Sequence, residues 1–562
     1  MSKARLVVLV LFASLAADSL MAFGADASPI KGVISVRKDG KGDFKRIIPA
    51  LMVSEPGDVI EIQDSSVYRE ILNLAPFPNR TIRAKKGEHP TLVGQIRMGN
   101  YVVIDGLKIT YPSKVRGGES TITSSGRKGW IVRNCDIYDV PANSHAFYMV
   151  NGTRDCKILF NRIHGGRRHN GAVYITVNYN KGNNLIANNI IYNIGRISIA
   201  SSSPNNRIVS NTFYKSGIRC SSPSTVIENN IVVSGSIISS GPVRYNCVWK
   251  GKCKGSVEEG NISQDPLLVA PEEGDFHLKS ETGRWDPKLN KWVKDEVTSP
   301  CIDAGDPKSE CKNEPSGKRI NIGAYGNTAY ASAGRGAKWP LPKPKEEVLP
   351  APKVAPGPRK DYAALVKKYG WIQSKIDALG PKGGVVEIPE GTHTIFAPIV
   401  IEKSNVTLRG AGAEKTIIKG LTKAAGKIKV GLLGKDISGV VIENLCIDNG
   451  VDLYYLSKSK VQNVSGSGVY LRCCKGVTIT KCKLNSIFAD RGRDLIITDN
   501  VCSHCRGWWG IDLQSTIHAT VSRNVCHSNG NGGISLYSGA VNCIVTDNIC
   551  YGTVSYTHLR AH

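Results

Sequence analysis

Aromatic residues and long apolar runs are both scarce in this chain of 562 residues. Aromatics make up 7% of it, and beyond the N-terminus no apolar run reaches 18 residues. The lack of such runs excludes a protein with several membrane-spanning helices. The 58 glycines follow no Gly-X-Y period, which excludes collagen, and a hydrophobic fraction of 41% is too high for a disordered chain.

Basic residues are in excess, with 73 Lys+Arg against 47 Asp+Glu, a formal net charge of +26 and a pI near 9.4. This balance predicts an anionic partner, such as an acidic polysaccharide, a nucleic acid or an acidic membrane surface. Asn, Gly, Ser, Ile and Val are abundant, which favours β structure with many turns. The length alone predicts two to four domains.

The two ends of the chain differ from the rest. Residues 1–27 have a positive start, an apolar stretch and the small-x-small site Ala25-Asp26-Ala27, which is the pattern of a secretory signal peptide. The alternative is an N-terminal membrane anchor, and both predict export. Residues 554–562 do not continue the pattern before them. We therefore expect them to be non-native and the second domain to be truncated.

One phrase recurs along the chain: two or three β-branched residues, a polar residue, Asn, any residue and an apolar residue. In the first half its Asn position, with spacings of 26, 28, 22 and 19 residues, falls on Cys135, Asn161, Asn189, Asn211 and Asn230. In the second half we place it on Asn444, Cys482, Asn500, Asn524 and Asn548. A period of roughly 20 to 28 residues with short strands predicts a β-solenoid. A leucine-rich repeat would need Leu at fixed places, and a β-sandwich would lack the longer period.

Two stretches carry more specific segments. The first reads Ser-Val-Arg-Lys-Asp-Gly-Lys-Gly-Asp-Phe at 35–44 and Ser-Pro-Cys-Ile-Asp-Ala-Gly-Asp-Pro at 299–307. The second reads Gly-Gly-Val-Val-Glu-Ile-Pro-Glu-Gly at 383–391 and Val-Thr-Leu-Arg-Gly-Ala-Gly at 406–412. In these segments the chain resembles the right-handed parallel β-helix proteins of the pectate lyase superfamily, of the type that bacteria secrete.

The resemblance implies an all-β fold with two tandem right-handed parallel β-helices. Between them, residues 336–360 contain seven prolines, which predicts an extended linker. We therefore predict a first β-helix domain at 28–335 and a second at 361–553. A helix is expected over 361–379, and in the family such a helix covers the open end of the solenoid.

Nine of the 16 cysteines lie between Cys446 and Cys550. Equivalent positions stack in a solenoid, so we predict a ladder of buried thiols made of Cys446, Cys502, Cys526 and Cys550. Metal binding and disulfides are the alternatives. Because export permits disulfides, the loop-flanking pairs are better candidates, namely Cys301 with Cys311 and Cys247 with Cys253.

A row of aromatic and basic residues is expected on the outside of the first domain. Aligned strand phrases at 146–149, 172–175, 196–199 and 217–220 place Tyr148, Tyr174, Ser198 and Arg219 outward in one row. Arginine forks pair with carboxylate or sulfate, so the row predicts binding of an extended anionic sugar chain. Around it we expect His145, His164, Arg167, Arg168, His169 and Arg196. The alternative is a solvated basic face.

The second domain has a similar concentration of functional groups. Trp508-Trp509 is the most unusual dipeptide in the chain, and it lies close in sequence to His504, Arg506 and Asp512. Exposed Trp beside such groups predicts a sugar subsite, while a Trp that fills the core is the alternative. Aligned phrases place Tyr470, Asp512 and Ser535 outward on nearby coils.

Two enzyme chemistries fit these residues. A lyase needs a base and a cation, Ca²⁺ or Arg, at the carboxylate of a uronate, and a hydrolase needs two carboxylates. We predict catalysis by Arg168, His169, Tyr174, His504 and Asp512. We predict sugar binding by Tyr148, His145, Arg167, Arg196, Arg219, Arg506, Trp508 and Trp509. The motifs of methylesterases, polygalacturonases and mannuronan epimerases are absent, so the resemblance assigns no catalytic residue.

The sequence thus predicts an exported protein that acts on an acidic polysaccharide, with lyase-type cleavage preferred. The alternatives are a non-catalytic adhesive surface protein, a glycoside hydrolase and a uronate epimerase. Ca²⁺ is the one cofactor that these chemistries suggest, and no metal ligand is identified. Nucleic acid is disfavoured as a partner because no dedicated motif is present. No membrane span is expected after removal of the signal, and the oligomeric state stays open.

Overall fold

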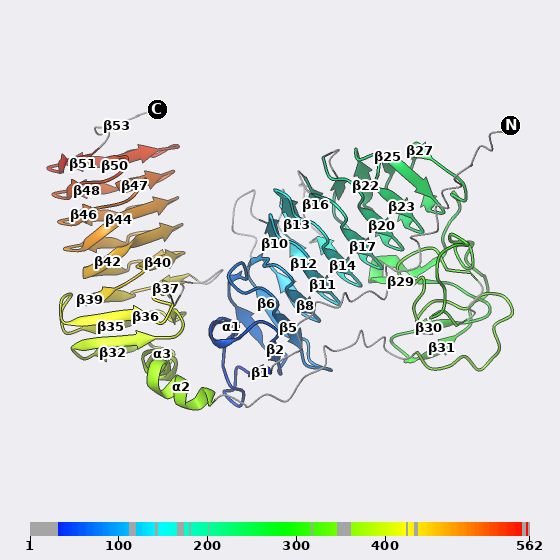
Figure 1. Ribbon diagram of the computed structural model, residues 1–562, viewed down its shortest axis with the longest axis horizontal. Coiled ribbons are helices and arrows are strands. Elements are labelled where there is room, and N and C mark those ends of the chain that lie inside the picture. The colour runs from blue at the N-terminus through cyan, green and yellow to red at the C-terminus, as the bar shows by residue number, and fades with distance from the viewer. Residues whose placement is uncertain are drawn as a thin grey trace, which may run out of the picture.

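The computed structural model describes residues 32–111, 120–140, 144–165, 174–178, 181–199, 202–315, 319–344, 361–422, 425–431, 436–553 and 558–559; of 174–176 and 558–559 it describes the backbone. Almost all regular structure is parallel β-strand, arranged as two β-helices in tandem (Figure 1). The predicted fold class is therefore confirmed. In the described part of the chain, no helix is long and apolar enough to cross a membrane.

Each coil of the first solenoid crosses three faces, which we call A, C and B in chain order. Face A consists of β1 (Val33–Val36), β2 (Val59–Ile62), β5 (Thr81–Ala84), β8 (Val103–Asp105), β11 (Ile131–Arg133), β14 (Lys157–Leu159), β17 (Leu185–Ala187), β20 (Arg207–Val209) and β23 (Val226–Glu228). Face C consists of β3 (Val67–Arg69), β6 (Thr91–Val93), β9 (Lys108–Thr110), β12 (Asp136–Val140), β15 (Arg162–Gly165), β18 (Ile190–Tyr192), β21 (Thr212–Tyr214), β24 (Ile231–Val233) and β26 (Cys247–Trp249). Face B consists of β4 (Leu72–Asn73), β7 (Ile96–Arg97), β10 (Ile122–Ser125), β13 (His145–Val150), β16 (Tyr174–Val177), β19 (Arg196–Ile199), β22 (Gly217–Cys220), β25 (Ile237–Arg244) and β27 (Cys253–Val257).

The second solenoid repeats the same three faces. Face A holds β32 (Gly384–Ile388), β35 (Val406–Gly410), β43 (Thr478–Thr480), β45 (Ile496–Thr498), β48 (Thr520–Ser522) and β51 (Ile544–Thr546). Face C holds β33 (Gly391–Ile395), β36 (Thr416–Gly420), β46 (Val501–Ser503), β49 (Val525–His527) and β52 (Ile549–Tyr551). Face B holds β34 (Ile399–Ile401), β37 (Ile428–Val430), β40 (Val451–Tyr454), β47 (Trp509–Gln514), β50 (Gly532–Tyr537) and β53 (His558–Leu559). Three longer strands bend across corners, β39 (Val441–Ile447), β42 (Lys460–Arg472) and β44 (Lys483–Asp490), and β38 (Ile437–Ser438) pairs with β41 (Leu456–Ser457).

Stacks of β-branched and Leu side chains fill both solenoids. On face A, the register aligns Ile82, Ile104, Val132, Ile158 and Ile186, each at most 1% exposed. Alternation along a strand sends these residues inward and their neighbours outward. Burial of the stacks is the main stabilising contribution to each coil.

The corner between faces A and C is held by a ladder of asparagines. The backbone N–H of Asn161 donates to Oδ1 of Asn189 at 3.0 Å, and Nδ2 of Asn161 donates to the Val132 carbonyl. The same bonds continue through Asn211, Asn230 and Asn246, and in the second solenoid through Asn500, Asn524 and Asn548. These ladder positions are confirmed. Asn444 is the exception, because it lies one place earlier, in register with Asn463 and ahead of Leu445.

The thiol ladder is partly as predicted. Cys502, Cys526 and Cys550 are in register, and the first two are fully buried. Cys446 pairs with Ser465 and is not part of this row. None of the 16 cysteines forms a disulfide, and Cys301 packs beside Cys247 in one apolar cluster.

Two antiparallel hairpins follow the first solenoid. They pair β28 (Leu268–Ala270) with β29 (Asp275–Leu278), around a 3-10 turn at Pro271–Glu273, and β30 (Arg284–Asp286) with β31 (Lys291–Val293). This closing segment then returns along the A–C corner, where Gly323 N–H donates to the Asn229 carbonyl and Ala324 N–H donates to Thr212 Oγ1.

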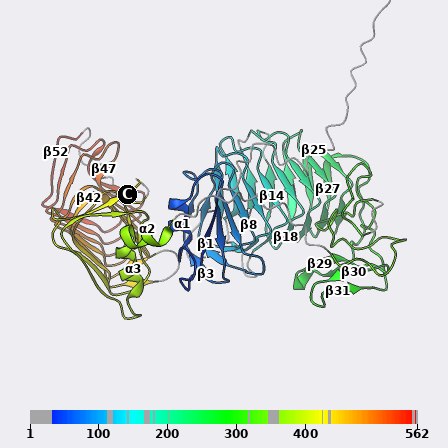
Figure 2. The same cartoon turned by 60° about the horizontal axis from the view of Figure 1, so that its bottom comes forward.

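The N-terminal ends of the two solenoids meet in a shared joint. The predicted helix over 361–379 is two helices, α2 (Tyr362–Tyr369) and α3 (Trp371–Ala378), divided at Gly370. Helix α3 covers the second core, while α2 brings Tyr362 to 5.4 Å from the ring of Phe44 beside α1 (Ile47–Val53). From this joint the two solenoids diverge (Figures 1 and 2).

Candidate functional site

The predicted outward row of the first solenoid lies on face B. Tyr148, Ser198 and Arg219 take the same place on their strands, and Thr176 stands between Tyr148 and Ser198. The prediction that Tyr174 fills that place was wrong by two residues. Tyr174 pairs instead with His145 and Arg196. A shift by two residues keeps the inward and outward alternation, so the sequence pattern could not detect it.

His145 and Tyr148 contact each other on β13. Their ring centroids lie 4.8 Å apart, and Ser120 Oγ lies 3.4 Å from Nδ1 of His145. Burial lowers the pKa of His145. A lowered pKa keeps the imidazole neutral at pH 7, in the form that accepts a proton. On later coils Arg196 and Arg219 are exposed, so face B presents a neutral base, a phenol and two guanidinium groups in sequence.

Other predicted members of this row lie elsewhere. Arg167, Arg168 and His169 fall outside the described residues. His164 belongs to face C, where its ring stacks on Tyr192 at 4.7 Å and its Nε2 lies 3.1 Å from Asp136 Oδ1. It therefore takes part in a structural stack away from face B.

Face B of the second solenoid carries a different ladder. Lys429, Asp452, Tyr470, Phe488, Asp512 and Ser535 follow one another in register. The predicted outward positions of Tyr470, Asp512 and Ser535 are thus in one row. Sequence reasoning missed Phe488, whose ring stacks on Tyr470 at 4.9 Å, because its strand phrase begins with Ser486 instead of Gly.

Asp512 is only 4% exposed although it occupies an outward position. Gln514 Nε2 donates to its Oδ2 at 3.1 Å, while Oδ1 has no hydrogen-bond partner among the described residues. Burial raises the pKa of this carboxyl. A carboxyl with a raised pKa is suited to donate a proton.

The predicted Trp subsite is a loop between β46 and β47. His504, Arg506 and Trp508 are exposed, and Trp508 is 59% exposed. The ring of Trp509 lies over Gly532 of the next coil, where any Cβ would come within 2.2 Å of it. His504 contacts His527 at 5.6 Å between ring centroids. The loop and Asp512 thus share a coil, but the loop lies at the C–B corner and Asp512 lies on face B.

The two B faces approach each other near the joint. Tyr111 and Ile71 of the first solenoid pack with Tyr455, which follows β40. Burial lowers the pKa of Lys429 and raises that of Tyr454. Arg97 on β7 interacts electrostatically with both of these side chains. Lys427 Nζ holds both oxygens of Asp452 at 3.0 Å. Face B therefore joins groups from both solenoids at this end.

Among the residues described, no group of three or more His, Cys, Asp or Glu side chains is arranged to hold a metal ion.

Family models match two parts of the chain. Residues 415–560 match the right-handed β-helix region, and residues 206–305 match a family described as disaggregatase related. The match at 415–560 agrees with the parallel β-helix architecture of the chain, as the sequence predicted. No curated protein sequence matches the chain.

Solved structures to which the chain is similar include two lyases and an epimerase. Pectate lyase Pel9A is 11% identical, with 53% of this chain and 97% of that chain covered and a TM-score of 0.31. The PL6 family alginate lyase AlyGC is 10% identical, with 94% and 100% covered and a TM-score of 0.21. The A-module of the Azotobacter vinelandii mannuronan C-5 epimerase AlgE4 is 9% identical, with 86% and 91% covered and a TM-score of 0.19.

Proposed function

We propose that this chain is an exported protein that binds an acidic polysaccharide along face B of the first solenoid and cleaves it by β-elimination. The observation that carries the proposal is the neutral His145 in contact with Tyr148, followed along the same face by Arg196 and Arg219. The net charge of +26 favours the same class of ligand. The signal peptide at residues 1–27 supports export.

The side chains supply each part of an elimination. His145 takes the proton from the uronate carbon beside the carboxylate, and the electron pair forms a double bond to the neighbouring ring carbon. The bond from that carbon to the glycosidic oxygen breaks, and the Tyr148 hydroxyl gives its proton to the leaving oxygen. Arg196 pairs with the carboxylate, where negative charge develops. The products are an unsaturated uronate and a new chain end.

Hydrolysis is the second candidate function, and Asp512 favours it. A buried carboxyl with a raised pKa on face B of the second solenoid is suited to protonate a glycosidic oxygen. A second carboxylate would be required; Asp452 lies on the same ladder but three coils away, about 14 Å at about 4.8 Å per coil, beyond the roughly 5 to 9.5 Å of glycosidase carboxyl pairs. Hydrolysis leaves no unsaturated product, so one assay separates the two candidates.

The test is to incubate the full chain with polygalacturonate, alginate and heparin, with Ca²⁺ and with a chelator. We expect ultraviolet absorbance from unsaturated uronate with one of these polymers. New reducing ends without this absorbance would show that the protein is a hydrolase and would overturn the lyase proposal. Binding with no cleavage of any polymer would overturn the lyase proposal in favour of a non-catalytic adhesive protein.

Variants then locate the site. His145→Ala should lower the elimination rate by about 100-fold or more, as expected for loss of a general base. His518→Ala is the matched control, because His518 is exposed on the second solenoid away from face B. The lowered pKa of His145 predicts that the acid limb of the rate profile lies below the ordinary histidine value of about 6.5. A rate that is unchanged in His145→Ala would overturn the assignment.

A further inference from the structure

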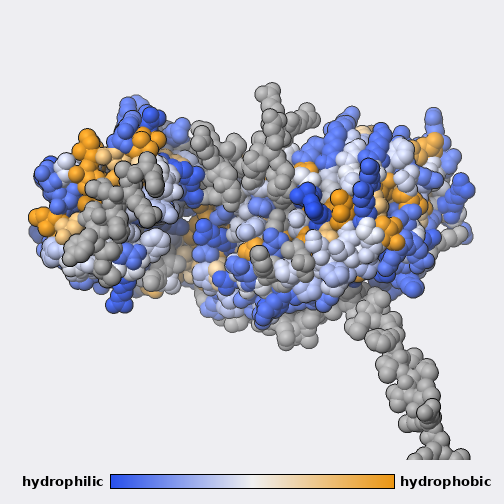
Figure 3. All heavy atoms as spheres, turned by 90° about the horizontal axis from the view of Figure 1, so that it is seen from above, coloured by the Kyte–Doolittle hydropathy of each residue, from blue (hydrophilic) through white to orange (hydrophobic). Residues whose placement is uncertain are grey.

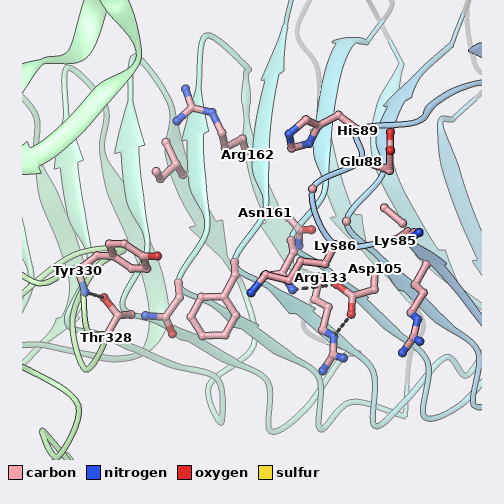
Figure 4. Close-up of a pocket in the computed structure, with 18 of the residues that line it drawn as sticks. Lys85, Lys86, Glu88, His89, Asp105, Arg133, Asn161, Arg162, Thr328 and Tyr330 are labelled. Carbon is pink, nitrogen blue, oxygen red and sulfur yellow. Dashed lines mark hydrogen bonds and ion pairs between the residues drawn. The ribbon is translucent and has the colours of Figure 1, made fainter. Parts of the chain in front are cut away.

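A groove of about 810 Å³ lies on the side of the first solenoid opposite face B. Figure 4 shows residues that line it. Its floor is the A–C corner, and none of the residues predicted to bind sugar lines it. In Figure 4, Thr328 and Tyr330 of the closing segment stand at one end, and Lys85, Lys86 and Glu88 stand at the other.

The groove is the part of the corner that the closing segment leaves open. That segment is fixed at the coil of Asn188, whose Nδ2 donates to the carbonyls of Ala324 and Gly326 at 3.0 and 2.9 Å. The opposite wall is the loop 85–89, which Ser65 holds by donating to Glu88 Oε2 at 2.6 Å and accepting from His89 N–H at 2.9 Å. The floor between Ala84 and Asn188 is about 19 Å long, because successive coils lie about 4.8 Å apart. Both walls are held by hydrogen bonds, so the groove is preformed.

The charges of the groove leave a positive surplus. On the floor, Arg83 pairs with Glu61 at 2.7 Å, and Arg133 pairs with Asp105 at 2.8 Å, where Asn134 also donates. These pairs neutralise the two floor carboxylates. The rims then carry Lys85, Lys86 and Arg162 against the single carboxylate of Glu88. Such a balance attracts anionic groups into the groove.

Phe160 is an unusual residue for its place on the floor. It has φ 56°, a left-handed conformation that a bulky side chain rarely adopts. The equivalent corner places on the neighbouring coils hold Asn134 and Asn188, which take this conformation more readily. The backbone here accepts strain and thereby places a half-buried ring on the groove floor. Tyr330 adds a second half-buried ring to the lining.

We propose that this groove is a second binding site, which holds an acidic oligosaccharide segment apart from the cleavage site. Its rim cations pair with carboxylate or sulfate groups, and Phe160 and Tyr330 lie against sugar rings. The ligand class rests on the proposed function, while the site does not use any residue of face B. Holding the polysaccharide at two sites raises its effective concentration at the cleavage site on face B.

The test compares binding of polygalacturonate and heparin by full-length variants in native affinity electrophoresis. Lys85→Glu/Lys86→Glu should weaken binding about ten-fold or more. Lys250→Glu/Lys252→Glu, with the same change of charge at exposed positions on another coil, should bind more tightly than the groove variant. Equal loss in both double variants would show a general charge effect and overturn the site.

Phe160→Asn separates binding from stability. Asn is the residue found at the neighbouring corners, so we expect an unchanged or higher Tm together with weaker glycan binding. A phenylalanine with only a structural role would give a lower Tm and unchanged binding, which would contradict the proposal.

The outcomes for the two sites are independent. If the groove variants bind more weakly but the wild-type protein forms no product, the lyase proposal fails and the groove proposal is supported. If His145→Ala abolishes product formation while Lys85→Glu/Lys86→Glu and Phe160→Asn bind as the wild type does, the lyase proposal is supported and the groove proposal fails.

Discussion

Face B carries opposite chemistry in the two solenoids, although the same alternation of side chains builds both. In the first, Arg196 and Arg219 are exposed and His145 is neutral. In the second, the equivalent ladder holds Asp452 and Asp512, which are 9% and 4% exposed. The fold therefore decides which side chains point outward, and the surroundings of each decide its charge. Exposed guanidinium groups attract an anion, whereas burial raises the pKa of the Asp512 carboxyl and favours proton donation by it.

The corners of the two solenoids differ in how far they are covered. In the first, the asparagine ladder lies under the closing segment at Asn229 and ends at a groove. In the second, the coils of β50 to β52 expose large side chains, namely Tyr537, Val541, Ile544, Ile549 and Tyr551. Figure 3 shows hydrophobic residues on the surface of this solenoid. The second ladder is buried at Asn500 and Asn524 and opens only at Asn548, so equal substitutions at Asn211 and Asn548 should have unequal costs.

The largest expected effect is loss of a ladder asparagine in the first solenoid. Asn211 is fully buried, donates to the carbonyls of Ile186 and Val209, and accepts from Asn189. Asn211→Ala should cost about 4 kcal/mol, because several buried groups lose their partners at once. Asn548→Ala, at the half-exposed end of the second ladder, should cost about 1 kcal/mol, since water can replace its bonds. Calorimetry of the two variants measures the difference, and equal losses would show that covering does not matter.

The next effect concerns the joint between the solenoids. Phe44 is 4% exposed and contacts Tyr362 and Phe396, with ring centroids 5.4 and 5.9 Å away. Phe44→Ala should cost about 3 kcal/mol, because it removes buried apolar area from a site that both solenoids share. We also expect calorimetric transitions that move further apart and a wider angle between solenoids in X-ray scattering. An unchanged scattering profile would show that other contacts fix the angle.

The repeat phrase was enough to predict the solenoids and most of their corners. Asn161, Asn189, Asn211 and Asn230 are where the phrase placed them, because a buried corner amide must meet the same hydrogen bonds in every coil. Asn444 misled the alignment because asparagine also suits the left-handed position one residue earlier, where φ is 57°. One residue type thus serves two adjacent corner positions.

The functional surfaces were harder to predict. Tyr174 was misplaced because the phrase at 172–175 fits the inward and outward alternation as well as the strand at 174–177 does. The groove joins residues from Glu61 to Tyr330, and no local pattern relates them. Likewise, Arg97 and Lys429 come together only through the joint. Local periodicity fixes coils, whereas sites between distant segments depend on tertiary packing.

The smallest expected effect tests the buried carboxyl of the second solenoid. The pKa of Asp512 is raised in the folded state, so the folded protein holds this proton more tightly than the unfolded chain does. Stability is therefore lost as the pH rises above the ordinary Asp pKa of about 3.9. Asp512→Asn should therefore stabilise the protein by about 1 kcal/mol at pH 7, and the gain should vanish below about pH 4. Asp448→Asn is the control, because Asp448 is exposed and should give no gain at either pH. A destabilised Asp512→Asn protein at pH 7 would mean that the carboxylate is stabilised where it lies, and the contrast between the two B faces would then rest on the arginines alone.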